Sequence, residues 1–91
     1  RYYPFYRNIG EREMTIAGNL ATIGSLQGSI AGASVRMDSP GITHSERNQL
    51  RQSIDSMRSQ IRQRELANTR LEDEITEWAN RLREIKAQYG R

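Results

Sequence analysis

The sequence predicts an all-α protein: an elongated helical hairpin, or a two-helix protein with a long C-terminal coiled-coil helix, that forms oligomers. Residues 46–89 contain no glycine or proline and keep apolar side chains at a seven-residue spacing, which is typical of a coiled coil. A cluster of turn-forming residues separates them from a second periodic segment. The mean hydropathy is −0.84, and 91 residues bury only a modest core, so we expect the chain to fold as an elongated helical object or within an assembly.

Residues 1–13 form an aromatic and charged N-terminal segment, which opens with RYYPFYR. Its rings gather around a proline, with an arginine at each end. We expect these rings to anchor the chain by covering the junction of the two helices. Docking in a partner's groove, contact with a membrane interface and stacking on nucleic-acid bases are the alternatives. The anchor residues are Tyr2, Tyr3, Phe5 and Tyr6.

Residues 14–37 are predicted to form a helix that packs through small side chains. Its central stretch, residues 16–35, carries no charge. On a helical wheel, one face holds the larger aliphatic residues Ile16, Leu20, Ile23, Leu26 and Ile30. The opposite face resembles a glycine zipper, whose small residues let helix backbones approach closely; these are Ala17, Ala21, Gly24, Ser25, Gly28, Ser29, Gly32 and Ala33.

Both faces of this helix are expected to be covered, because a helix that packs on one side normally carries charge on the other. A close-packed protein assembly would cover them. Two alternatives remain open, namely insertion into a membrane as an oligomer and a flexible linker. A single lipid-spanning helix is disfavoured because Asn19, Thr22 and Gln27 dilute the apolar residues.

Residues 38–45 are predicted to form a turn, and residues 46–89 a long amphipathic helix. Pro40 and Gly41 are turn formers, and Thr43 with Glu46 forms the sequence signature of a capping box. A helix of this length would span about 65 Å at 1.5 Å per residue.

The long helix carries a heptad seam with two polar interruptions, at Arg64 and Asn68. An asparagine inside such a seam commonly fixes register and strand number. Leu66 lies outside the seam. The charged residues of this helix come in blocks, which could form a hydrated surface or select a partner helix of complementary charge. Parallel and antiparallel pairing both remain open. The seam residues are Leu50, Ile54, Met57, Ile61, Asn68, Leu71, Ile75, Trp78, Leu82, Ile85 and Tyr89.

Catalytic chemistry is not indicated by any pattern in the chain. There is no cysteine, no phosphate-binding loop, no metal-ligand spacing and no dinucleotide-binding motif. His44 is the only histidine; with Ser45 and Asp38 it suits turn and capping chemistry better than a catalytic triad. We therefore expect no enzyme, no cofactor, no metal and no small-molecule substrate.

A family resemblance rests on the order of these features. A small-residue helix leads into GASVRMDSPG, residues 32–41, and then into a long Arg/Gln/Glu helix that ends in AQYG. This order is similar to that of the internal virion proteins of short-tailed bacteriophages, the smaller ejection proteins that are stored inside the capsid. The resemblance covers roughly residues 16–90 and carries over no catalytic residue. It implies a virion component that is transferred to the host envelope and helps to form a DNA conduit.

The function expected from the sequence is therefore that of a structural subunit in an oligomeric virion assembly. Its partners would be further copies of the chain and other proteins of the assembly, with DNA contact and membrane contact as an oligomer left open. One alternative is a coiled-coil adaptor or filament subunit without a viral role. Another is a nucleic-acid-binding module that uses Arg1, Arg7 and the block of arginines from Arg47 to Arg70.

Overall fold

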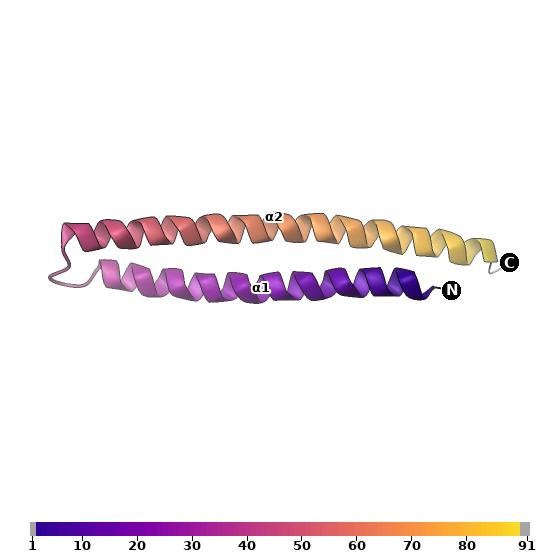
Figure 1. Cartoon of the computed structure of the whole chain (residues 1–91), viewed down its shortest axis with the longest axis horizontal. Coiled ribbons are helices and arrows are strands. Elements are labelled where there is room, and N and C mark those ends of the chain that lie inside the picture. Colours follow the sequence, from indigo (N-terminus) through magenta and orange to yellow (C-terminus); the bar gives the residue numbers. More distant parts are fainter. Residues whose placement is uncertain (1, 90–91) are drawn as a thin grey trace.

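The chain folds as a helical hairpin. A computed structural model describes residues 2–89, which form α1 (Tyr3–Met37) and α2 (His44–Tyr89). The two helices run antiparallel and side by side, with the chain reversal at one end of the rod and both termini at the other (Figure 1). The rod measures 74 × 14 × 14 Å. The predicted all-α hairpin is confirmed, whereas its association into oligomers stays a prediction.

The N-terminal segment is part of α1, so the sequence-based division at residue 13 does not correspond to a break. Pro4 lies in the first turn of the helix, where a missing backbone N–H costs nothing because that group has no intrahelical partner. The backbone carbonyl of Tyr2 accepts hydrogen bonds from the N–H groups of Phe5 and Tyr6, at 3.1 and 3.3 Å. The proline therefore starts the helix and does not interrupt it.

The connection between the helices is a type II turn followed by a helix cap at Thr43. The N–H of Ile42 donates to the carbonyl of Ser39 at 3.4 Å, and Gly41 has φ +80°, the left-handed conformation that this turn requires at its third residue. Thr43 Oγ1 accepts from the N–H of Glu46 at 3.1 Å and donates to Glu46 Oε1 at 3.0 Å. The predicted cap at Thr43 is confirmed, although the Glu46 carboxylate binds the Thr43 hydroxyl where a full capping box would bind the Thr43 backbone N–H. The helix α2 begins at His44, two residues before the predicted start.

Replacing Gly41 by alanine should lower the free energy of unfolding by about 1 kcal/mol, because a Cβ is disfavoured at positive φ. Urea unfolding followed by the fluorescence of Trp78 measures this change. Gly10→Ala is the matched control: Gly10 is helical, nothing lies within 4 Å of an added Cβ, and alanine should stabilise the helix by about 1 kcal/mol. Equal shifts in the two variants would contradict the role of the turn.

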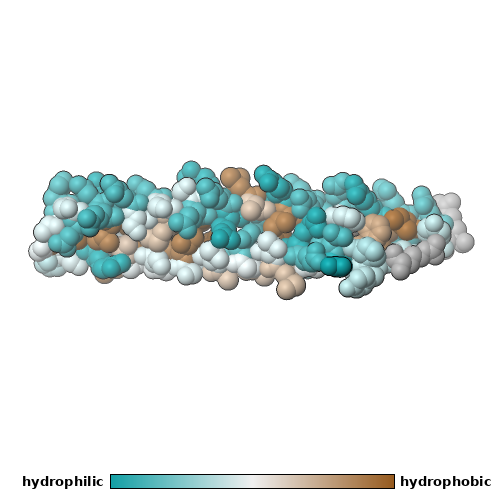
Figure 2. Space-filling view, viewed as in Figure 1, coloured by the Kyte–Doolittle hydropathy of each residue, from teal (hydrophilic) through white to brown (hydrophobic). Residues whose placement is uncertain are grey.

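Both helices contribute a heptad seam to the contact between them. In α2, the predicted seam residues are buried or half-buried against α1, apart from Tyr89, which is exposed at the end of the helix. Hydrophobic side chains accordingly follow the line between the helices in Figure 2. The buried and half-buried seam positions of α1 alternate in steps of three and four residues; they are Tyr2, Phe5, Ile9, Arg12, Ile16, Asn19, Ile23, Leu26, Ile30, Ala33 and Met37.

The aliphatic face predicted for residues 16–35 is correct except at Leu20, which is 57% exposed. The seam needs a side chain three residues after Ile16, and that position belongs to Asn19, which is buried. Hydrophobicity alone assigned Leu20 to the wrong side because the seam position is polar.

Candidate assembly interface

A polar layer lies inside the seam near the middle of the rod. Asn19 and Asn68 are each 6% exposed, and Asn19 Nδ2 donates to Asn68 Oδ1 at 2.8 Å. Arg64 Nη1 donates to Asn19 Oδ1, also at 2.8 Å. The two interruptions predicted in the seam of α2 therefore meet the same residue of α1. Among the described residues, no buried side-chain nitrogen or oxygen lacks a hydrogen-bond partner. The layer fixes the register because sliding the helices would separate these amides.

A second polar contact joins the helices through Arg12, which also occupies a seam position. Its Nε forms an ion pair with Glu74 Oε2 at 2.9 Å, and both side chains are partly shielded from water. Its Nη1 donates to the backbone oxygen and to Oδ1 of Asn8, each at 3.1 Å. Arg12 and Asn19 were missed as seam residues, although the alternation in steps of three and four along α1 would have located both.

The open end of the hairpin is held by aromatic and cationic side chains. The rings of Phe5 and Trp78 meet edge to face, with centroids 5.5 Å apart and an angle of 77° between planes. The guanidinium carbons of Arg12 and Arg81 lie 5.7 and 5.5 Å from the centre of the Trp78 ring. Such an aromatic pair contributes about 0.5–1.5 kcal/mol beyond its buried area. The first turns of α1 are thereby attached to α2.

The predicted anchor residues lie at this same end, far from the turn that joins the helices. Phe5 and Tyr2 are half-buried, whereas Tyr3 and Tyr6 are exposed. Lys86 Nζ lies 5.3 Å from the Tyr2 ring and 5.2 Å from the Tyr6 ring, and it donates a hydrogen bond to the Tyr6 hydroxyl. Some of the anchor residues therefore form contacts within the chain, between its N-terminal end and the last turns of α2.

The predicted small-residue face points away from α2. Of its members only Ala33 is buried between the helices; the others are exposed, namely Ala17, Ala21, Gly24, Ser25, Gly28, Ser29 and Gly32. Nothing in the hairpin lies within 4 Å of a Cβ added at any of these three glycines. The hairpin itself therefore does not require small residues here. We call the exposed side of residues 14–35 the outer face of α1.

The outer face of α1 combines small residues with a few large apolar ones and no charge. Met14 is 76% exposed, Val35 is 70% exposed, and Leu20 lies at the margin of the face. Residues 14–35 contain no ionisable side chain. A helix whose other side meets water usually carries charged residues there, and a contiguous exposed apolar surface usually marks an interaction site.

The outer side of α2 is different, because it is dominated by charged and polar side chains. Leu66, at 64% exposure, is the large apolar residue exposed in the middle of this helix. Figure 2 shows hydrophilic side chains over most of α2, and neutral or weakly hydrophobic ones over much of α1. Only α1 therefore offers a long uncharged surface to a partner.

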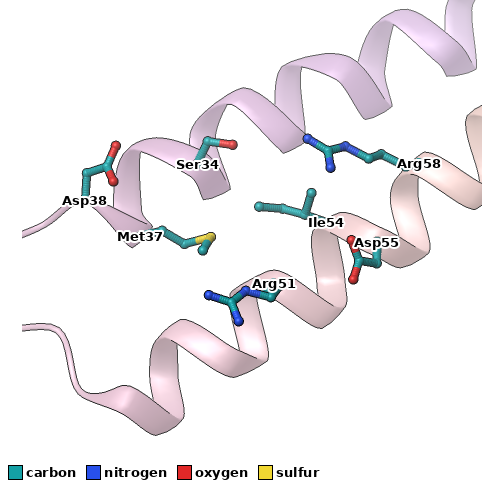
Figure 3. A pocket seen from close by; sticks show the side chains of 7 residues that line it. All are labelled: Ser34, Met37, Asp38, Arg51, Ile54, Asp55 and Arg58. Atoms are coloured by element: carbon teal, nitrogen blue, oxygen red, sulfur yellow. The ribbon is translucent and has the colours of Figure 1, made fainter.

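A shallow groove of about 430 Å³ lies beside the turn, and its lining gives less indication of a ligand than the outer face of α1 gives of a partner. Met37 and Ile54 point into the space between the helices there (Figure 3). Around them lie two carboxylates and two guanidiniums, which give the groove no net charge for selecting an ion; they belong to Asp38, Asp55, Arg51 and Arg58. Within residues 2–89 there is no group of three side chains that could hold a metal ion.

Comparison with known proteins found no matching family model, no matching curated protein and no matching solved structure. The similarity to phage internal virion proteins therefore stays a prediction from the order of sequence features. Neither α1 nor α2, as far as the structure describes them, combines the length and apolar character that a membrane span requires.

Proposed function

We propose that this chain is a structural subunit, a helical hairpin that joins a larger assembly by packing the outer face of α1 against other helices. The observation that carries the proposal is the absence of charge from residues 14–35 on a side of α1 that α2 leaves uncovered. The role of the chain is mechanical: α2 covers the seam side of α1 and leaves the other side available to a partner.

The glycines of α1 support this proposal. A glycine in an exposed helix costs about 1 kcal/mol relative to alanine. Gly24, Gly28 and Gly32 have open space where their Cβ atoms would lie, so alanine would fit in the isolated hairpin. Close packing of a neighbouring helix would explain glycine at these positions, because two helix backbones approach most closely where no side chain lies between them.

A nucleic-acid-binding role has less support. Arg51 lines the groove beside the turn with Asp38 and Asp55, and Arg64 is bonded to Asn19 in the polar layer. The arginines of α2 also fall at different positions of the heptad, so they do not form one basic stripe along the rod. The similarity to phage ejection proteins agrees with a structural subunit and indicates a virion as one assembly in which to look for it.

Photocrosslinking in cells that make the chain tests the proposal. A diazirine analogue of leucine keeps the size of the side chain and can be incorporated at Leu20, at the margin of the outer face of α1. We expect adducts between Leu20 and helices outside its own chain, since a partner covers this face. The matched control is Leu66 on the outer side of α2, with a similar exposed fraction. Equal adduct yields at Leu20 and Leu66 would count against the proposal.

A further inference from the structure

We infer that the outer face of α1 binds the same face of a second copy of this chain, with the two α1 helices antiparallel and a two-fold axis beside Gly24 and Ser25. The inference rests on the proposed function and adds the identity and orientation of the partner. Three features of α1 support it: the charges that border the face, the large side chains at its ends and the small residues between them.

The charges at the two ends of the face are opposite. Glu13 precedes the uncharged stretch and Arg36 follows it; both are exposed, and neither belongs to an ion pair within residues 2–89. A parallel pair of α1 helices would bring like charges together at each end. An antiparallel pair instead brings Glu13 and the partner's Arg36 to the same end of the contact, so each end carries charges of opposite sign.

The large apolar residues at the ends of the face have the same midpoint along the sequence as these two charged residues. Met14 and Val35 are adjacent to Glu13 and Arg36, and both are strongly exposed at the ends of the face. The midpoint of each pair along the chain falls between Gly24 and Ser25. The register that joins the charges therefore also places Met14 against the partner's Val35, where both can be removed from water.

The small residues follow the same two-fold pattern. In this register Ala21 lies opposite the partner's Gly28, and Ala17 lies opposite the partner's Gly32. No pair on the central line of the contact contains two bulky side chains except Met14 with Val35 at its ends. The helix backbones can therefore approach closely over about 30 Å, at 1.5 Å per residue.

The resulting dimer is a row of four helices, with the two α1 helices inside and the two α2 helices outside. Each α1 is covered on its seam side by α2 and on its outer face by the partner. This arrangement accounts for the unequal distribution of charge, because only α2 keeps a side toward water. A two-fold contact of this kind is closed, so it stops at two chains and does not extend into a filament.

Light scattering over a range of protein concentrations tests the pairing. The chain of 10.5 kDa should give about twice that mass, because a two-fold contact joins two copies. Gly28→Leu should raise the dissociation constant at least 10-fold by holding the backbones apart. Its matched control is Ser59→Leu, which adds the same side chain to an exposed position of α2. Circular dichroism should show that both variants keep their helices, because Gly28 has open space beside it in the hairpin.

Disulfide formation tests the orientation, since the native chain has no cysteine. When Met14→Cys and Val35→Cys chains are mixed and oxidised, the antiparallel register predicts a mixed disulfide between the two kinds of chain. A parallel pair would instead join each variant to itself, and predominance of those products would overturn the inference.

The outcomes separate this inference from the proposed function. A chain that stays monomeric at every concentration, or a dimer that Gly28→Leu leaves unchanged, overturns the pairing of copies through this face. The proposed function would still stand in either case if Leu20 formed adducts with other proteins in the cell and Leu66 did not. A dimer that depends on Gly28 and gives the mixed disulfide supports both.

Discussion

Leu82→Ala should lower the free energy of unfolding by about 2–4 kcal/mol, through the loss of buried methyl groups and the space that they leave. Leu82 is 7% exposed, in the seam next to the aromatic contacts at the open end of the hairpin. The rod has a core only one side chain deep, so few neighbouring residues can move in to fill the space. Urea unfolding monitored by circular dichroism measures the effect.

Leu66→Ala is the matched control for this prediction. It removes the same atoms from the same helix, but Leu66 is 64% exposed on the outer side of α2. The expected change is within about 0.5 kcal/mol, as for most substitutions on a surface. If both variants lost the same stability, the seam assigned to α2 would not be the structural core.

The polar layer should show a strong coupling between Asn19 and Asn68. Asn19→Leu removes the donor to Asn68 Oδ1, and Asn68→Leu removes the acceptor of Asn19 Nδ2. Either change therefore takes away the hydrogen-bond partner of a buried amide group, which should cost about 1–3 kcal/mol. The double variant removes both amides, so it should recover most of that loss. Arg64 then turns its guanidinium to water, because its side chain lies at the exposed edge of the seam.

A double-mutant cycle built from urea unfolding measures this coupling. The expected coupling free energy is about 1–3 kcal/mol, whereas residues that do not interact give additive effects. Thr69→Leu paired with Asn19→Leu is the control cycle, because Thr69 is exposed and has its hydroxyl bonded to its own helix. Additive losses at Asn19 and Asn68 would mean that their hydrogen bond does not set the register of the hairpin.

The helical content and the turn could be predicted from the sequence because both depend on neighbouring residues. The absence of glycine and proline in residues 46–89 predicts an uninterrupted helix, and Gly41 and Thr43 mark the reversal of the chain through local conformational preferences. The seam of α2 was also predictable, because seven-residue spacing identifies the residues that share a face. The start of α1 was not predictable in the same way, because residues 1–13 were assigned to a separate aromatic and charged segment, although Pro4 suits a first turn.

By itself, then, the sequence determined the helical character of both segments, the turn and, apart from Leu20 and Ala33, the faces on which apolar and small residues lie. Only the tertiary structure decided which partner each face meets. It paired the seam of α2 with α1 of the same chain, and it turned the small-residue face outward. It also joined Asn19 to Asn68 and Arg12 to Glu74, contacts between distant parts of the chain. Periodicity shows which residues share a side of a helix, but the partner of that side depends on how the whole chain can satisfy its buried polar groups at once.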